Sequence, residues 1–407
     1  MRIASTFGLN QVVSHGFGVF LFAALIPMMR ESIAISYWHL ALIGALTQIA
    51  YLTGALLLSL IGHRISSGVI ALSTGMFTSG LLLTMAILDD PVWVMLVLTL
   101  CAASASVSWG ALVELISRYA SAAGRSTCLS TAASGTAWGY GMNGLVILMV
   151  VPVLGWRSSW ILAGIVGCLS VFLTWRLLKG LRQQSPLSES MVPVPESATT
   201  QGAGLNARML WQTVTRDRAA FFACLICCLV GLATMPFSSW LNIYLEEQGA
   251  VSSLGGYTWT IAGITGMFAG YLAGKVADAW GHGLALIIVF SGFAIGVLAF
   301  IFDPLRFAPL AGVGYGLMYF PMWGIIAGWL SRNYSAVATM QINSIGMVVF
   351  GIGGAAGNLL AGWFQEYSGS LSGIYLVIAV DSLILLLIAI YIVLTENRYN
   401  SLTADLN

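Results

Sequence analysis

Charged residues are scarce in this sequence. Lys, Arg, Asp and Glu make up 8% of the 407 residues, apolar residues make up 58%, and the mean hydropathy is +0.90. Because a soluble domain carries about a quarter charged residues, this composition excludes an ordinary water-soluble domain. The sequence also has no basic patch of the size that nucleic-acid binding needs. We therefore predict an integral membrane protein that has the lipid bilayer as its surroundings and no nucleic-acid partner.

Clusters of catalytic or metal-binding residues are also lacking. No nucleophile, general base and orienting partner occur together in a recognisable pattern. All six cysteines fall in apolar stretches, where Cys behaves as a small apolar residue, and the group from Cys224 to Cys228 has no accompanying ligand. We therefore expect neither enzymatic activity nor a cofactor or metal site. The 407 residues also show no sizeable soluble module, which we would expect in a membrane receptor or scaffold.

Long apolar runs are what the sequence has in abundance. A membrane-spanning helix needs about 20 apolar residues, whereas a transmembrane barrel strand has about ten residues of alternating polarity. The runs here are long and continuous, so we predict an all-α integral membrane protein with twelve transmembrane helices. The predicted spans are residues 7–29, 39–61, 68–88, 91–116, 127–151, 157–178, 219–243, 256–275, 284–302, 307–330, 338–363 and 372–394.

Basic residues are distributed unevenly between the two sides that alternate spans define. If the N-terminus is cytoplasmic, only Arg30, Arg157 and Arg306 of the 16 Lys and Arg residues lie outside. Basic residues favour the cytoplasmic side of membrane proteins. The bias predicts a multi-pass protein of the cell (inner) membrane with both termini in the cytoplasm.

The spans divide into two sets of six. Residues 180–218 are rich in Pro, Ser, Thr, Gln and Glu, which is the composition of a linker. We predict bundles at 1–179 and 219–407, and a short amphipathic helix at 207–215 on the membrane surface. The dipeptide Trp109-Gly110 recurs as Trp323-Gly324, and Gly155 recurs as Gly369, at the same offset. The halves are therefore predicted to be parallel repeats.

One polar turn between two apolar runs carries a recognisable pattern. From Gly274 to His282 it reads Gly, any residue, aliphatic, small, Asp, two residues, Gly and basic, which resembles the loop motif of the major facilitator superfamily. Twelve spans, the six-plus-six division and the long central loop extend the resemblance over nearly the whole chain. It implies two six-helix bundles that rock about a central site. It also implies that Asp278 locks the cytoplasmic ends in the outward-facing state, with Arg332 as a candidate partner.

The first half departs from that pattern. The expected Gly, Asp, Gly and basic residues are replaced by Ser59, His63, Ser66 and Ser67, and only Arg64 is retained. We therefore predict an asymmetric inner gate in which Asp278 matters more than His63. The predicted gating residues are Arg64, Arg118, Gly274, Asp278, Gly281 and Arg332.

The glycines of the fifth span resemble a motif that antiporters of the family carry. Its usual Pro is replaced here by Tyr140 and one Gly by Asn143, so export is not inferred from it. The fourth-span Arg of many proton-coupled members is also absent, with Cys101 near its place.

Ionisable residues inside a membrane are expensive and mark functional sites. His15 shares a helical stripe with Gln11, Gly18 and Phe22, and the resemblance puts the first span beside the central cavity. A His that titrates near neutral pH can bind substrate or carry a proton. The alternative is a buried His that hydrogen-bonds a neighbouring helix.

Two carboxylates are the other candidates for proton coupling. Glu114 lies one turn before Arg118, which favours an inner-gate ion pair over proton transfer. Asp381 lies near the middle of the last span, as a proton carrier or as the partner in a structural hydrogen bond. Because the twelfth helix of the resembling fold is peripheral, the structural role is favoured for Asp381.

Aromatic and amide residues supply the remaining candidates for a central cavity. Each aromatic has a bland alternative at the membrane interface or in helix packing. The predicted substrate-binding residues are Gln11, His15, Gln48, Tyr51, Ser108, Trp109, Trp138, Tyr140, Asn143, Tyr257, Tyr319, Trp323 and Asn343. No Lys or Arg lies in mid-span, which disfavours small inorganic anions.

Together these features predict a monomeric secondary active transporter. Its substrate is expected to be a small neutral, zwitterionic or amphipathic organic molecule, taken up together with protons by alternating access. A proton-driven exporter of drugs or metabolites is the alternative within transport. A non-transporting membrane receptor or scaffold is the alternative from another class.

Overall fold

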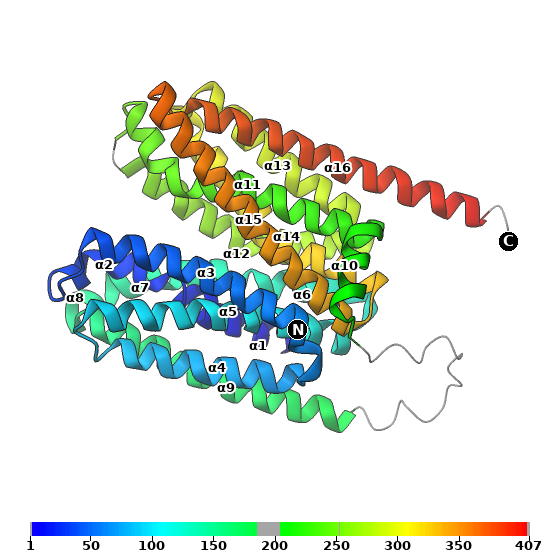
Figure 1. Cartoon of the computed structure of the whole chain (residues 1–407), viewed down its shortest axis with the longest axis horizontal. Helices are drawn as coiled ribbons and strands as arrows, with labels where there is room; N and C mark the ends of the chain where they lie inside the picture. The colour runs from blue at the N-terminus through cyan, green and yellow to red at the C-terminus, as the bar shows by residue number, and fades with distance from the viewer. Residues whose placement is uncertain (1, 185–203, 252, 405–407) are drawn as a thin grey trace.

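The computed structural model describes residues 2–184, 204–251 and 253–404, and they are almost entirely helical (Figure 1). The first half contains α1 (Arg2–Gln11), the π-helix η1 (Val12–Phe17), α2 (Leu21–Arg30), α3 (Tyr37–Ile61), the 3-10 helix η2 (Gly62–Arg64), α4 (Ser67–Met85), α5 (Pro91–Tyr119), the 3-10 helix η3 (Ala122–Gly124), α6 (Arg125–Ala133), α7 (Gly135–Met149), α8 (Val151–Leu154) and α9 (Trp156–Gln184). The second half contains α10 (Ala207–Arg216), α11 (Arg218–Glu247), α12 (Ser253–Trp280), α13 (His282–Phe302), α14 (Pro304–Asn333), α15 (Ala336–Ser368) and α16 (Ser372–Ala404). No strand occurs in these ranges, and the predicted all-α class is confirmed.

The helices gather into two groups. In Figure 1 the first-half helices lie below those of the second half. The groups meet where α6 packs against α12 and α14, and where α15 packs against α3 and α5. Of the predicted linker, residues 185–203 lie outside the described part of the chain, so the domain boundaries stay a prediction. The short helix predicted at 207–215 is confirmed as α10.

Ten described helical segments are long and apolar enough to cross a membrane, and Arg2–Arg30 counts as one of them. Two predicted spans fall outside that set. The span predicted at 127–151 is split at Ser134 into α6 and α7, and the one predicted at 256–275 lies in α12, which has 28 residues. The first region falls short because neither α6 nor α7 alone is long enough to span. The second is rich in Gly, Ser and Thr, which lowers its hydropathy without preventing a helix of spanning length.

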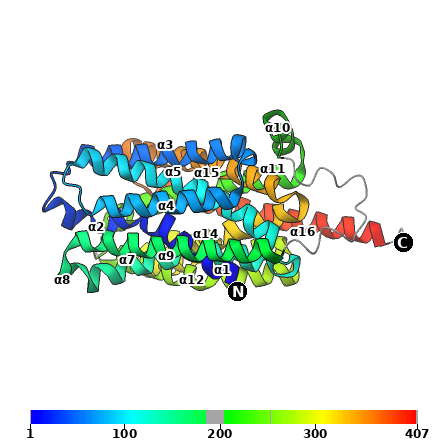
Figure 2. The ribbon, with the colours of Figure 1, turned by 90° about the horizontal axis from the view of Figure 1, so that it is seen from below.

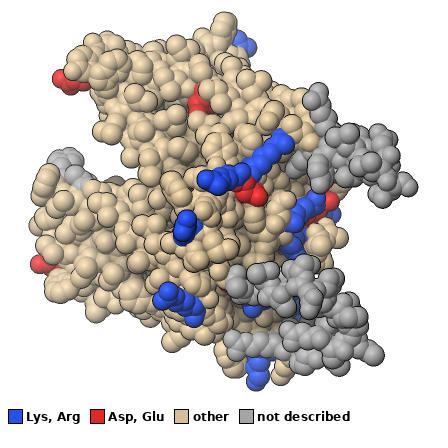
Figure 3. Space-filling view, turned by 45° about the vertical axis from the view of Figure 1, so that its right-hand side comes forward, with Lys and Arg blue, Asp and Glu red and all other residues tan. Residues whose placement is uncertain are grey.

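Apolar side chains cover much of the outside of the molecule. Phe302, Leu359 and Leu387 are 86%, 75% and 64% exposed. Figure 3 shows a face on which charged side chains are few and scattered. Such a surface is unfavourable in water and favourable against lipid, so the multi-pass membrane protein that the composition predicts is also what the surface indicates.

Repeat-related glycines have a positive φ in the two halves. The φ angles of Gly155 and Gly369 are 76° and 68°. Each lies between two helices, where the chain must reverse and a side chain would be strained. In both halves an Asp-Pro step also starts a long helix, because Asp90 and Asp303 cap α5 and α14 through their side chains.

Each half has its own apolar core, and a third cluster joins them. The second-half core is built around buried aromatic rings such as Phe237, Phe300 and Tyr375. The joining cluster brings Leu58 and Leu112 of the first half together with Met340 of the second half. Contacts of this kind hold the halves together at one end of the bundle.

We call that end, which carries Arg118, Arg125, Lys275 and Arg332, the basic end. It is the end where α5 and α14 finish and α6, α11 and α15 begin. Figures 1 and 2 place α10 at the same end, towards which α16 extends beyond the other helices.

Candidate functional site

A cavity of about 500 Å³ lies between the two halves. It is lined from the first half by η1 and helices α1, α3, α5, α6 and α7, and from the second half by α11, α12, α14 and α15. The predicted substrate-binding residues that line it are Gln11, His15, Gln48, Tyr51, Trp109, Tyr140, Tyr319 and Trp323. Figure 3 shows the surface hollowed between the halves on the left, away from the basic side chains.

The π-helix η1 holds His15 at the cavity wall. Its wider turn gives hydrogen bonds from Gly18 N to Val13 O (2.9 Å) and from Phe20 N to His15 O (3.2 Å). Regular helix resumes only at Leu21. Such π-helical turns are rare in proteins, and those that occur are often found at functional sites.

This irregularity corrects the predicted stripe of the first span. Gln11 and His15 line the cavity, but Phe22 is buried in the apolar core, and Val19 and Phe20 line the cavity instead. The period of 3.6 residues does not carry through η1 and the turn that follows it, so a stripe drawn on a regular helix goes out of register after His15.

His15 has a hydroxyl partner at each ring nitrogen. Nδ1 lies 3.1 Å from Ser14 Oγ, and Nε2 lies 3.2 Å from Tyr51 Oη. A hydroxyl can donate or accept a hydrogen bond, whereas a protonated imidazole only donates. These partners can therefore satisfy the imidazole both before and after it takes up a proton.

The second half faces His15 with a wall of aromatic rings. Tyr315 and Tyr319 stack with centroids 5.0 Å apart, and Phe350 contacts both Tyr319 (6.3 Å) and Trp323 (5.0 Å). Tyr315, Tyr319 and Trp323 follow one another at a spacing of four on α14. That spacing is a readable signal, and extending it by one turn would have found Tyr315, which sequence reasoning missed together with Trp259, Phe320 and Phe350.

Three predicted binding residues are buried away from the cavity. Ser108 donates to Asn10 Oδ1 (2.9 Å), and Asn143 Nδ2 donates to Gly16 O (2.8 Å). The nearest partner of Asn343 Nδ2 is a thioether sulfur in its own helix, at 3.9 Å. Ser108 and Asn143 join one helix to another, so their polarity serves packing within the first half.

Two further predicted residues lie on the outside. Trp138 is 45% exposed and contacts Phe268 edge-to-face, while Tyr257 is 64% exposed. Neither lines the cavity. Their amphipathic rings suit the membrane interface, which is the alternative that the sequence left open for each aromatic.

At the basic end, Asp278 joins the two halves. Its carboxylate accepts hydrogen bonds from the backbone N–H groups of Ser126 (3.0 Å) and Thr127 (2.7 Å), in the first turn of α6. The expected partner, Arg332, forms no ion pair with it among the described residues. A helix N-terminus offers free donors and the positive end of its dipole, which makes it a good anion site.

Two motif glycines permit this contact. A Cβ on Gly274 would lie 2.5 Å from Thr127 Cα, so only glycine lets α12 approach α6 this closely. Gly281 has φ of 95°, which allows the tight turn from α12 into α13. That turn brings His282 within 2.7 Å of Ser126 Oγ.

A further bond completes what we call the latch. Arg125 Nη1 donates to Ser331 O at 3.0 Å. The latch consists of residues 125–127 of α6 together with Asp278, His282 and Ser331 of the second half. It closes the basic end by hydrogen bonds that run from one half to the other.

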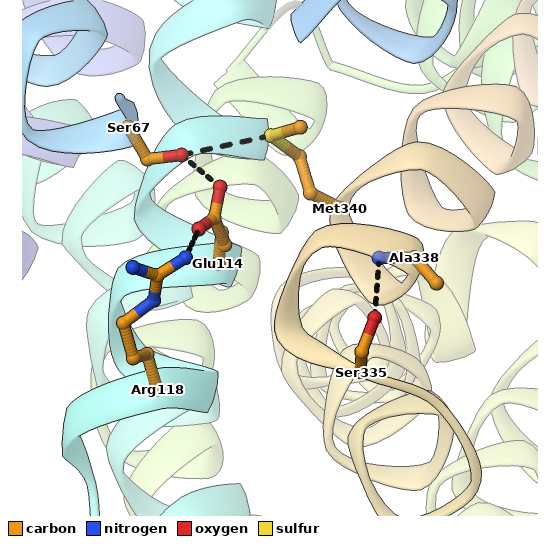
Figure 4. A network of polar contacts seen from close by, with 6 residues as sticks. All are labelled: Ser67, Glu114, Arg118, Ser335, Ala338 and Met340. Atoms are coloured by element: carbon orange, nitrogen blue, oxygen red, sulfur yellow. Dashed lines mark hydrogen bonds and ion pairs between the residues drawn. The ribbon is translucent and has the colours of Figure 1, made fainter. Parts of the chain in front are cut away.

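The repeat-related contact in the first half is weaker. Ser67 occupies the place of His282 and donates to the buried Glu114, which forms the predicted ion pair with Arg118 (Figure 4). Across the interface Ser67 Oγ meets only Met340 Sδ, at 3.9 Å. A sulfur is a weak acceptor, so this side of the basic end lacks a charged bridge between the halves.

Gln341 of α15 lies opposite the end of α3 in the first half and makes a second polar contact between the halves at the basic end. Its Nε2 donates to Ser59 O and to Leu205 O, each at 2.8 Å, and its Oε1 accepts from Leu205 N at 2.7 Å. The side chain is fully buried. Leu205 precedes α10 within the predicted linker of residues 180–218, so this part of the linker is held between the halves. Arg64, in the first-half turn after α3, is exposed.

Asp381 lies apart from the cavity, on α16. It is buried, and neither carboxyl oxygen has a hydrogen-bond partner within the described ranges. The structural hydrogen bond that the sequence favoured for it is therefore not found there. A buried carboxylate without a partner is unfavourable.

A family model described as the Major Facilitator Superfamily matches residues 11–341 of this chain. The chain belongs to the major facilitator superfamily. Membership makes it a transporter and not an enzyme, as the sequence predicted.

Solved transporters of the superfamily share this fold over almost their whole length. The E. coli fucose:proton symporter FucP is 13% identical, with 96% of this chain and 97% of FucP covered and a TM-score of 0.70. The human organic anion transporter MFSD10 is 14% identical, with 95% and 99% covered and a TM-score of 0.71. The proton:xylose symporter XylE is 13% identical, with 95% and 94% covered and a TM-score of 0.66. At such identities the likeness establishes the fold alone. No curated protein sequence matches this chain.

Proposed function

We propose that this chain is a secondary active transporter that takes up a small neutral, zwitterionic or amphipathic organic solute together with protons. The observation that carries the proposal is His15, hydrogen-bonded to two hydroxyls at the wall of a cavity between two halves that are latched at one end. The cavity is built from one chain, which fits a monomer whose working halves are residues 1–179 and 219–407.

Alternating access follows from the position of the latch. The positive-inside bias assigns the basic end to the cytoplasm of the cell (inner) membrane, together with both termini. With that end held by Asp278 and its neighbours, the cavity faces outwards. Breaking the latch lets the halves rock and opens the cavity to the cytoplasm.

The lining of the cavity supports a solute without a strong net charge. No Asp, Glu, Lys or Arg occurs among its described lining residues. Anionic substrates in a low-dielectric site are usually held by Arg or Lys. Aromatic faces with a few hydrogen-bonding groups suit neutral or amphipathic organic molecules instead.

Proton coupling is assigned to His15. Among the described side chains that line the cavity, it is the only imidazole, and an imidazole can both take up and release a proton while it keeps its hydrogen bonds. FucP and XylE are themselves proton symporters of sugars, which supports coupling in a chain of this fold. Glu114 is held in an ion pair with Arg118 and Asp381 lies outside the cavity, so both rank behind His15.

Uptake into proteoliposomes tests the proposal. Ligands are first found by thermal shift, since a compound that binds the folded state raises its apparent stability. An inward proton gradient is then expected to drive accumulation of the labelled ligand above its external concentration, and a protonophore is expected to abolish that accumulation. Equilibration that ignores the gradient would contradict proton coupling.

A proton-driven exporter is the second candidate, favoured by the aromatic wall of α14 and α15. Growth of cells that express the protein distinguishes the two directions. An exporter expressed in cells raises their resistance to amphipathic toxic compounds, whereas an uptake system supports growth on an external nutrient.

A further inference from the structure

The two walls of the cavity differ in chemistry. Its amide and imidazole groups belong to Gln11, His15 and Gln48, all in the first half. Both halves contribute aromatic rings, and the longest connected series of them comes from α14 and α15 of the second half. Its Ser238 hydroxyl already donates to the backbone of Met235, at 2.9 Å. The amide and imidazole groups are therefore concentrated on one side.

Two donors on the first-half wall have no acceptor. Gln11 Nε2 and Trp109 Nε1 are without a hydrogen-bond partner in the described structure, and the two residues are 2% and 3% exposed. A buried N–H without an acceptor is unfavourable. A ligand that brings an acceptor oxygen to these groups therefore removes an existing penalty.

The opposite wall offers flat apolar faces. The rings of Tyr315, Tyr319, Phe350 and Trp323 contact one another in a continuous series with centroid separations of 5.0 to 6.3 Å. Such a surface binds a ring or short chain by dispersion and by burial of apolar area. It does not satisfy a molecule that carries hydroxyls on every side.

We infer that the cavity binds an amphipathic solute in one orientation. The acceptor head, such as a carbonyl or amide oxygen, lies against Gln11 and Trp109 beside His15, and the apolar body lies against Tyr319 and Phe350. The inference rests on the proposed function and narrows its substrate class to solutes with one polar pole. The cavity volume of about 500 Å³ suits a small organic molecule.

A chemical cycle on the purified protein tests this orientation. The probes are phenylacetamide (head and ring), acetamide (head alone) and D-xylose (hydroxyls on every side), with binding measured by thermal shift and calorimetry. Phenylacetamide is expected to bind most tightly. The variant Gln11→Met removes a donor at nearly the same side-chain volume, and Trp109→Phe removes the indole N–H while it keeps an aromatic ring. Each should weaken phenylacetamide binding by about three- to tenfold.

Tail variants complete the cycle. Phe350→Ala should weaken phenylacetamide by about tenfold and leave acetamide unchanged, because acetamide has no ring to place there. Phe364→Ala, on the same helix and outside the cavity lining, is the matched control and should change neither.

The outcomes separate this inference from the proposed function. If D-xylose binds and accumulates with protons while phenylacetamide does not bind, the inference fails and the transport function stands. If phenylacetamide shows the expected pattern and no proton gradient moves it, the orientation stands and the coupling fails. Absence of binding by every amphipathic probe, or equal effects of Phe350→Ala and Phe364→Ala, overturns the inference.

A second observation independently concerns the basic end. The buried amide of Gln341 on α15 binds Ser59 of α3 and Leu205 at the same time. A Cβ on Gly204 would lie 2.3 Å from His63 Cβ, so the segment is packed tightly against the first-half loop. Asn206 then caps α10 by accepting from Met209 N (2.9 Å). Separation of α3 from α15 must break these contacts.

We propose that residues 204–206 are part of the inner gate, in addition to the latch and the Ser67 contact, and that their contacts with Gln341 and His63 must break before the basic end opens. The variant Gln341→Leu removes three hydrogen bonds, and Gln365→Leu, near the far end of the same helix, is its control. Hydrogen–deuterium exchange on the full-length protein is expected to become several-fold faster in Gln341→Leu, both at residues 204–210 and at the start of α6. Gln365→Leu should leave both regions unchanged.

A merely local role predicts a different pattern. Faster exchange at residues 204–210 with an unchanged start of α6 would mean that the segment loosens without opening the latch, and would overturn the proposal. Unchanged exchange at both places would do the same. Slow exchange in the core of α13 in all variants verifies that the protein stays folded.

Discussion

Replacing His15 by alanine is expected to abolish proton-driven accumulation while the folded protein still exchanges solute across the membrane. The imidazole is the group at the cavity wall that can gain or lose a proton and keep hydrogen bonds through Ser14 and Tyr51 in both states. Without it, the proton no longer binds where the halves meet. In a pH gradient, the final accumulation should fall to the equilibrium level. The initial rate of gradient-driven uptake should fall at least about a hundredfold below wild type, as for other positioned proton-transfer groups.

Counterflow of solute at equal pH on both sides distinguishes loss of coupling from a structural defect, because a structural defect would abolish counterflow as well. Counterflow should persist in His15→Ala, because exchange of solute needs rocking but no net proton movement. His39→Ala, at a half-buried histidine that caps the start of α3 and lies outside the cavity lining, is the control and should keep gradient-driven uptake. Asp381→Asn and Glu114→Gln should keep gradient-driven uptake. Loss of that uptake in Asp381→Asn, with wild-type behaviour in His15→Ala, would move the coupling site to α16.

Asp278→Ala is expected to disturb transport far more than His63→Ala, although the two residues occupy repeat-related positions. Asp278 accepts two backbone hydrogen bonds at the N-terminus of α6, and hydrogen bonds to a charged group contribute about 1.5–3 kcal/mol each. Even a loss of about 2 kcal/mol shifts the balance between outward- and inward-facing states by roughly thirtyfold. His63 Nδ1 has no partner among the described residues, and the His63 side chain lies against Gly204, so truncating that ring should cost less than removing the Asp278 carboxylate.

Initial rates of uptake and accessibility of the basic end measure this asymmetry together. Asp278→Ala should expose the start of α6 and reduce gradient-driven uptake at least about tenfold, whereas His63→Ala should stay within about twofold of wild type. Asp278→Asn, which keeps one acceptor oxygen, should fall between them. Equal effects at the two sites would contradict an asymmetric latch.

The cavity was predictable where the signal was a spacing of one helical turn, before any irregular turn changed the register. Gln11 with His15, and Tyr319 with Trp323, repeat at a spacing of four and do line the cavity. The same reasoning failed at Asn143, whose amide reaches Gly16 on the first span. A polar side chain in an apolar span needs a hydrogen-bond partner. The sequence does not say whether the side chain faces a cavity or bonds a neighbouring helix.

The latch shows a second kind of limit. Sequence reasoning singled out Asp278 but looked for a side-chain partner, Arg332, because only side chains differ from residue to residue. The actual partners are backbone N–H groups of α6, which every sequence possesses. The role of Gln341 was likewise invisible, since Ser59 and Leu205 contribute only main-chain atoms and lie far from it along the chain.

By itself the sequence determined the solvent, the helical class, the superfamily and the repeat. These follow from local composition and spacing: long uncharged runs must form helices in lipid, and Gly155 and Gly369 recur with positive φ between two helices of each half. Only the tertiary structure decided which polar side chains face the cavity, how η1 turns the first span out of register after His15, and what Asp278 binds. The reason is physical, because those outcomes depend on where backbone donors and neighbouring helices meet in space, and one-dimensional periodicity carries no record of that meeting.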